Sequence, residues 1–143
     1  MIKIAIGSDH AGFDLKQELI TYLNGKGIEV KDHGCYTAER VDYPDFGHAV
    51  ANAVLNSDVK FGMLMCGSGN GINMTANKHA GIRSALCWNA EISALARQHN
   101  DANIMALPAR FISKETAIKC ADAFLSAVFE EGRHADRIRK IDC

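Results

Sequence analysis

Short apolar runs alternate along the chain with longer segments in which apolar residues recur at helical spacing. In one such segment Leu15, Leu19 and Leu23 lie on a single face of a helix. The short runs are typical of buried strands because polar residues do not interrupt them. They predict five strands, at residues 2–7, 28–32, 61–66, 84–87 and 104–107.

The helical segments begin and end at ordinary signals. Gly25 and Gly27 close the first helix, and Ser113 and Thr116 are both candidate caps of the fifth. Strands that alternate with helices are typical of a parallel sheet, so the pattern predicts an α/β fold: a Rossmann-like three-layer sandwich with a five-stranded parallel sheet flanked by helices, in a single domain over residues 1–143. Helices are expected over residues 13–23, after Pro44, from the glycine loop at 67, over 89–97, after Ser113 and, as a short basic helix, over 132–142.

Composition excludes several classes of protein. A formal net charge of -1 gives no sign of nucleic-acid binding. No apolar run approaches the length of a membrane span, and the N-terminal MIKIAIGSDH lacks the apolar core of a signal peptide. The five cysteines are an odd number without a Cys-x-x-Cys pair, so neither disulfides nor a thiolate metal site is expected. A reducing cytoplasm fits this cysteine usage best.

Three loops that follow predicted strands are rich in reactive and ligand-binding residue types. They are residues 8–12 (Ser-Asp-His-Ala-Gly), 66–71 (Cys-Gly-Ser-Gly-Asn-Gly) and 108–110 (Pro-Ala-Arg). Ligands of open parallel sheets bind outside the carboxyl ends of the strands. We therefore expect these loops to converge on one site.

The glycine loop joins a strand to a helix, a common arrangement for binding an anion. It lacks the Gly-Lys-Ser/Thr ending of a nucleotide P-loop. The dinucleotide fingerprint requires a third glycine where this chain has Ile72. The loop therefore predicts a site for an anion smaller than a nucleotide.

Cys66 is the residue of this loop most suited to chemistry. A free cysteine is often a small buried apolar residue, and that is the interpretation for Cys35, Cys87 and Cys120. Cys66 differs because it stands at a strand end beside glycines and a helix N-terminus, where thiolates are favoured. The glycines either form a tight turn or present amides to a developing oxyanion.

Two further groups of polar residues have both a structural and a functional interpretation. Asp9 and His10 either cap the first helix or bind a hydroxyl and an anion. Arg133 and Arg137, four residues apart, form either a solvated basic face or a phosphate site. His99 precedes a strand and so lies at the end of the sheet opposite the loops. From topology alone it is structural, or it serves the site of a second subunit.

Five stretches spread over nearly the whole chain carry a family resemblance: IGSDHAGFDLK (6–16), ERVDYPDFG (39–47), CGSGNGINMTANKHAGIR (66–83), RQHNDANIMAL (97–107) and GRHADRI (132–138). They resemble the ribose-5-phosphate isomerase B family, whose group also contains isomerases of allose and galactose 6-phosphates. The resemblance implies an aldose-ketose isomerase that interconverts D-ribose 5-phosphate and D-ribulose 5-phosphate through a cis-enediolate, without a metal or cofactor. It also implies a place in the non-oxidative pentose phosphate pathway.

The resemblance implies roles for individual residues. Cys66 is similar to the base that moves a proton between C2 and C1, and the loop of Gly67, Ser68, Gly69, Asn70 and Gly71 to the anion hole. His99 matches the residue that assists opening of the furanose ring from the neighbouring subunit, which replaces the structural role that topology favours. The expected partners are a small sugar phosphate and a second copy of the chain, in a homodimer with shared active sites or a dimer of dimers. The positions that contact sugar oxygens are Asp9, Tyr43 and Asn100, and those that bind phosphate are His10, Arg110, Arg133 and Arg137.

The family has two kinds of base, and the sequence distinguishes them. One branch has glycine at the Cys66 position and glutamate at the Ile72 position, whereas this chain has the thiol and an apolar Ile72. Ser68 replaces a frequent threonine and keeps the hydroxyl. Pro108 replaces a frequent glycine, which leaves the path of the loop with Arg110 open.

Three alternatives to a pentose phosphate isomerase remain at this point. The first is the same chemistry on a six-carbon sugar phosphate, such as allose 6-phosphate or galactose 6-phosphate. The second is a nucleotide-binding module without catalytic activity. The third is a cysteine-dependent phosphatase, although Cys66 is not followed by the Cys-x5-Arg loop of that class.

Overall fold

The computed structural model describes residues 1–142, and Cys143, one of the five cysteines of the sequence, lies outside the described residues. A five-stranded sheet in the order β2-β1-β3-β5-β4 forms its centre, and all neighbouring strands are parallel. Each strand begins and ends within one residue of its predicted position. They are β1 (Lys3–Ser8), β2 (Glu29–Asp32), β3 (Phe61–Cys66), β4 (Ser84–Leu86) and β5 (Ile104–Pro108).

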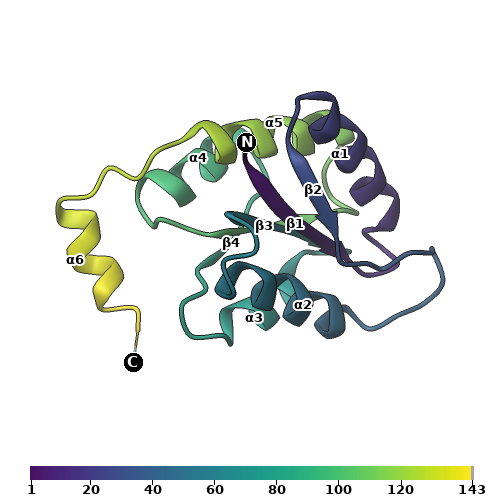
Figure 1. Ribbon diagram of the computed structural model, residues 1–143, viewed down its shortest axis with the longest axis horizontal. Coiled ribbons are helices and arrows are strands. Elements are labelled where there is room, and N and C mark those ends of the chain that lie inside the picture. The colour runs from purple at the N-terminus through teal and green to yellow at the C-terminus, as the bar shows by residue number, and fades with distance from the viewer. Residues whose placement is uncertain (143) are drawn as a thin grey trace.

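Helices cover both faces of the sheet (Figure 1). Helices α1, α4 and α5 pack on one face and α2 and α3 on the other, with an apolar core in each space between layers. The expected three-layer α/β sandwich is confirmed. The helices are α1 (Phe13–Gly25), α2 (Tyr43–Leu55), α3 (Asn70–Asn77), α4 (Ala90–Gln98), α5 (Lys114–Ser126) and α6 (Arg133–Arg139).

The central strands supply side chains to both cores. In β1, Ile4 and Ile6 belong to the core beneath α1 and α5, whereas Ala5 belongs to the core beneath α2 and α3. Successive side chains of a strand point to opposite faces, so a strand covered on both faces must be apolar throughout. This explains the uninterrupted apolar runs of the sequence.

Helix ends differ from the predictions by a few residues. Helix α2 begins at Tyr43, one residue before Pro44, and α6 ends at Arg139 although the basic segment continues to residue 142. Ser113 rather than Thr116 caps α5, because its side chain accepts a hydrogen bond from the amide of Thr116 at 3.1 Å.

Two features of the topology position the candidate site. Strand β1 has β2 on one side and β3 on the other, so the order of the strands reverses at β1. In parallel sheets the loops that follow the strands diverge at such a point and leave a crevice at the carboxyl ends of the strands. Helix α6 stands apart from the sheet at one end of the molecule (Figure 1). Within residues 1–142, no helix combines the length and the apolar character needed to cross a membrane.

Candidate active site

The three loops predicted to converge follow β1, β3 and β5, which are neighbours in the sheet. The amide of Asp9 donates to the carbonyl of Met65 at 3.3 Å. The amides of Ala109 and Arg110 donate to the carbonyls of Cys66 and Gly67, both at 3.0 Å. The loops after β1 and β5 are therefore both bonded to the end of β3, and the predicted convergence is confirmed.

The glycine loop has a conformation that larger residues cannot adopt without strain. Gly69 has a φ of +76°, and a Cβ there would lie 2.6 Å from Cδ1 of Leu86. A Cβ on Gly71 would lie 2.5 Å from the ring of Tyr43, so the first side chain of α2 packs directly on this loop. The glycines bring the backbone of the loop close to its neighbours.

Helix α3 starts from this loop and leaves amides available at its N-terminus. Its first intrahelical hydrogen bond is donated by the amide of Asn73 to the carbonyl of Gly69 at 3.1 Å. The amides of Asn70, Gly71 and Ile72 come before Asn73 in the helix and therefore have no intrahelical acceptor. Among these three, the amide of Asn70 donates to Oγ of Ser68 at 3.3 Å. Amides in this position suit an anion.

Cys66 ends β3 directly beneath the glycine loop. It exposes only 5% of its surface and packs in the core that faces α2 and α3. The other described cysteines are also buried, and burial raises the pKa of Cys87 to about 11 and raises the pKa of Cys120. Sγ of Cys35 donates to the carbonyl of Thr37 at 3.2 Å. The expected packing role of these three cysteines is confirmed.

Asp9 and His10 both hold backbone in place. Oδ1 of Asp9, which is buried, accepts from the amide of Gly12 at 3.1 Å and closes the turn that leads into α1. Nδ1 of His10 lies 3.2 Å from both the amide nitrogen and the carbonyl oxygen of Val41, in the segment before α2. The expected capping is not observed, because the N-cap of α1 is Gly12 and no side chain caps the helix. The binding role of Asp9 and His10 stays a prediction.

Arg110 lies against the glycine loop. A Cβ on Gly67 would lie 3.1 Å from its Nη1. Pro108 pairs with Cys66 in the register of the sheet, and its carbonyl accepts from the amide of Phe111 at 2.9 Å, so the chain turns back immediately after β5. Pro108 is thus compatible with a path that brings the guanidinium to the loop.

The other predicted site residues lie elsewhere. His99 is the C-cap of α4, and Asn100 follows it in the loop before β5. Both therefore lie at the amino-terminal end of the sheet, where topology predicted His99. Arg133 and Arg137 belong to α6, which stands apart from the sheet (Figure 1). Within one chain the structure does not bring these four residues to Cys66.

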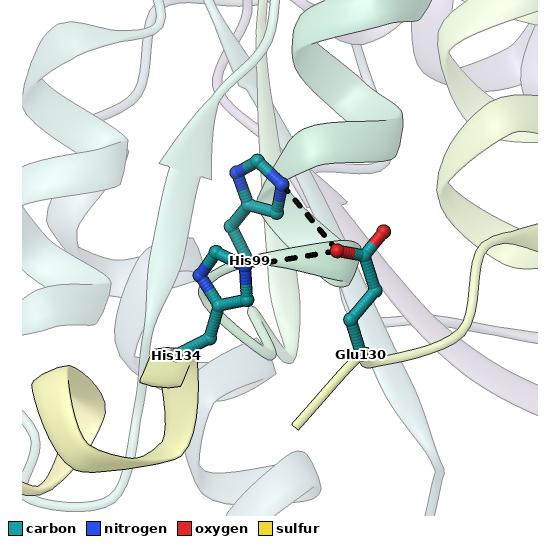
Figure 2. Close-up of side chains that lie close together, drawn as sticks. All are labelled: His99, Glu130 and His134. Carbon is teal, nitrogen blue, oxygen red and sulfur yellow. Dashed lines mark ion pairs between the residues drawn. The ribbon is translucent and has the colours of Figure 1, made fainter. Parts of the chain in front are cut away.

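His99 belongs to a cluster that the sequence interpretation missed. Its ring stacks on that of His134 with centroids 4.2 Å apart and 9° between planes. Oε1 of Glu130 lies 3.7 Å from Nε2 of His99 and 3.6 Å from Nε2 of His134 (Figure 2). Desolvation, followed by the charges of His99 and Arg133, lowers the pKa of His134. The four-residue spacing of Glu130 and His134 was the available signal.

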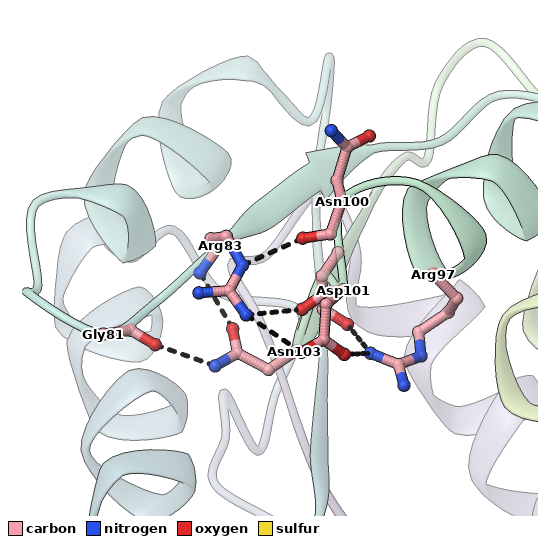
Figure 3. Close-up of polar contacts among 7 residues, drawn as sticks. Gly81, Arg83, Arg97, Asn100, Asp101 and Asn103 are labelled. Atoms are coloured by element: carbon pink, nitrogen blue, oxygen red, sulfur yellow. Dashed lines mark hydrogen bonds and ion pairs between the residues drawn. The ribbon is translucent and has the colours of Figure 1, made fainter. Parts of the chain in front are cut away.

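A charged network fixes the loop after His99 (Figure 3). Asp101 has a φ of +44°, which is unusual for a residue with a side chain. Arg97 donates to its Oδ1 at 2.8 Å, and Arg83 donates to its Oδ2 at 3.2 Å. Arg83 also donates to the carbonyl of Asn100 at 2.9 Å. Two guanidinium groups therefore stabilise the strained turn that presents His99 and Asn100.

Comparison with known proteins gives a consistent result. The profile of the ribose/galactose isomerase family matches residues 4–141. Ribose-5-phosphate isomerase B of Escherichia coli is 45% identical over 141 residues, which cover 99% of this chain and 95% of that protein. A probable ribose-5-phosphate isomerase B of Mycoplasma genitalium is 46% identical over 140 residues, covering 96% and 92%.

Solved structures resemble this fold equally closely. A ribose 5-phosphate isomerase of Thermotoga maritima superposes with a TM-score of 0.97 at 52% identity, covering 99% of this chain and 97% of that one. The Mycoplasma genitalium enzyme with bound ribulose-5-phosphate gives a TM-score of 0.92 at 45% identity, covering 97% and 93%.

Proposed function

Because the chain belongs to the ribose/galactose isomerase family, we propose that it interconverts D-ribose 5-phosphate and D-ribulose 5-phosphate in the non-oxidative pentose phosphate pathway. The observation that carries the proposal is the position of Cys66 at the end of β3, beneath an amide-rich glycine loop where three loops converge. The Mycoplasma genitalium relative with bound ribulose-5-phosphate supports this choice of sugar.

The reaction moves one proton between adjacent carbons. The thiolate of Cys66 takes the proton from C2 of the open-chain aldose, and the electron pair of the broken C–H bond passes to the carbonyl oxygen to give a cis-enediolate. Return of the proton to C1, together with transfer of the hydroxyl proton from O2 to O1, gives the ketose, in which O2 is the carbonyl oxygen. Amides of residues 67–71, together with the hydroxyl of Ser68, stabilise the charge on oxygen, as an oxyanion hole does. In this proposal neither a metal nor a cofactor takes part.

The remaining residues bind the parts of the sugar that do not react. We assign Asp9, Tyr43 and Asn100 to sugar hydroxyls, and His10 and Arg110 to the phosphate. Arg133 and Arg137 share one face of α6 because they are four residues apart, so both guanidinium groups suit the same phosphate. The phosphate is remote from C1 and C2, so it contributes binding energy that orients the reacting carbons.

We propose that each site is shared between two copies of the chain. Cys66 and Arg110 lie at one end of the sheet, whereas His99 and α6 lie at the other. A two-fold axis that brings these ends together creates two identical sites, in each of which His99 of one copy assists ring opening next to Cys66 of the other. A dimer of dimers would repeat this pair. The four described cysteines are free, which supports a cytoplasmic location.

Turnover by the purified protein on a panel of sugar phosphates tests the proposal. Ribose 5-phosphate should give a higher kcat/KM than allose 6-phosphate or galactose 6-phosphate. Preference for a six-carbon sugar would change the proposed substrate but not the proposed chemistry, and the family description includes both ribose and galactose isomerases. Release of inorganic phosphate without isomerisation, or no turnover of any of the three, would contradict the proposal.

A further inference from the structure

The cluster of His99, Glu130 and His134 has the donor set of a metal site (Figure 2). One carboxylate oxygen lies 3.6 and 3.7 Å from the two Nε2 atoms, and all three donor atoms lie within 4.8 Å of one another. Two imidazoles and one carboxylate are ligands that suit zinc, and three protein ligands leave a fourth position for water. We infer that this cluster binds a zinc ion and that bound zinc inhibits isomerisation by sequestering His99.

The two separations between the carboxylate oxygen of Glu130 and the Nε2 atoms are close to those that zinc requires. Zinc-nitrogen and zinc-oxygen bonds of about 2.0–2.2 Å in a tetrahedron separate the ligand atoms by roughly 3.3–3.5 Å. The separations between Glu130 and the two histidines exceed this range by only a few tenths of an ångström. The side chain of His134 is 9% exposed, whereas those of His99 and Glu130 are 39% and 51% exposed. His134 is therefore held in place, and the other two ligands can adjust to the ion.

The stacking of the two rings determines how the site must adjust. Rings that are stacked with only 9° between their planes keep their in-plane lone pairs in two nearly parallel planes, so both Nε2 atoms cannot point at one ion. One ring must turn, and His99 is the more exposed of the two. The second side-chain torsion of histidine has broad minima, which makes this rotation accessible. Zinc would therefore occupy Nε2 of His99 and also turn its ring.

The surrounding charges act in two directions. Arg133 and Arg137 belong to α6, the helix that carries His134, and their positive charges repel a cation. The negative charge of the Glu130 carboxylate, which lies 3.6 Å from Nε2 of His134, offsets that repulsion. Because the two arginines repel any cation, only an ion with strong affinity for imidazole can bind here, which favours zinc over calcium or magnesium.

Calorimetric titration of the full chain with zinc, after removal of metals by a chelator, tests the binding. We expect one zinc per chain, and binding weakened on the order of 10-fold or more in both Glu130→Gln and His134→Gln. The matched control is His79→Gln: Nε2 of His79 lies 2.6 Å from Nδ1 of His48, a histidine pair outside the cluster, and this variant should bind like the parent. Cys66→Ala should also bind like the parent, which excludes a thiolate site.

Three results would overturn the inference. The parent does not bind zinc, both Glu130→Gln and His134→Gln bind it as tightly as the parent, or binding is lost in His79→Gln or Cys66→Ala. Cobalt offers a second measurement, because a tetrahedral site with nitrogen and oxygen ligands produces visible absorption bands. These bands should appear with the parent and be absent with the two cluster variants. Parent protein that binds cobalt without such bands would overturn the tetrahedral site.

Inhibition is measured for each protein relative to its own rate in chelator. Zinc should slow the parent and His79→Gln at least 10-fold more than it slows Glu130→Gln and His134→Gln. Equal inhibition of all four would overturn the inhibitory role. The predicted inhibition rests on the proposed function, and failure of the zinc inference can be distinguished from failure of the proposed function. Absence of isomerisation in chelator would contradict the function, whereas calorimetry reports zinc binding without any turnover.

Discussion

Cys66 and Cys87 lie at the ends of strands of one sheet, yet their surroundings differ. Cys66 lies beneath the glycine loop, whereas Cys87 packs in the core beneath α4 and α5. We propose catalysis for Cys66, whereas Cys87 has the packing role that its burial in the core shows. A helix N-terminus follows both residues, so the glycines after Cys66 are the local signal that separates the two.

Replacement of Cys66 by alanine should abolish turnover and leave sugar-phosphate binding measurable. Loss of a general base costs on the order of 10²–10⁴-fold in rate, while the loops that hold the phosphate are unchanged. Turnover assays measure the loss of activity, and calorimetry measures sugar-phosphate binding separately. Cys120→Ala is the matched control, since it removes a buried thiol far along the sequence in α5 and should retain near-parental turnover. Near-normal activity of Cys66→Ala would remove the thiol from the mechanism.

Cys87 should make the stability of the protein depend on alkaline pH. Burial raises its pKa from 9.0 to about 11, so above pH 9 the unfolded chain loses this proton while the folded chain retains it. The free energy of unfolding therefore falls as pH rises from 9 to 11, with about 2 kcal/mol from this group. Urea unfolding across this range should give a shallower fall for Cys87→Ala than for the parent. Identical slopes would show that the thiol does not contribute.

Helix α1 has a glycine at each end, and the first of these glycines lies against the strand that carries Cys66. It begins after Gly12, where a Cβ would lie 2.6 Å from the carbonyl oxygen of Met65, the residue before Cys66. It ends at Gly25, where an added Cβ would meet no atom within 4 Å. The two glycines therefore have different reasons to be present, although they punctuate the same helix.

The substitutions Gly12→Ala and Gly25→Ala should accordingly have different effects. Gly12→Ala forces the backbone at residue 12 away from Met65 and should lower the free energy of unfolding by about 1–3 kcal/mol. Turnover should also fall, because the end of β3 that carries Cys66 is displaced. Gly25→Ala should be neutral or stabilise the helix by up to about 1 kcal/mol. Urea unfolding and steady-state turnover measure both variants. Similar behaviour of the pair would contradict the close approach of Gly12 to β3.

Elements were predictable from the sequence because their signals are local. Buried strands are apolar on both faces, and caps such as Ser113 act within three residues. The path of Arg110 was not predictable, because it depends on a turn after Pro108 and on the absence of a side chain at Gly67. Such contacts join residues from different loops and leave no periodic pattern.

At the scale of the whole molecule, the arrangement of site residues required more than the chain's own pattern. Strand order places the three loops together, and this was predictable from the rule for parallel sheets. The position of His99 at the opposite end was also predictable, but the role that we propose for it came only from family resemblance. The contact of His99 with Glu130 and His134 depends on the path of the chain from α5 to α6, which no local signal specifies.

The central claim is that one active site contains Cys66 of one chain and His99 of another. Its most direct test is a heterodimer of Cys66→Ala and His99→Ala chains, isolated through two different affinity tags. Each homodimeric variant should isomerise ribose 5-phosphate poorly. The heterodimer combines both lesions in one site and leaves the other site intact, so it should recover about half of the parental rate. A heterodimer as inactive as the two homodimers would contradict a shared site.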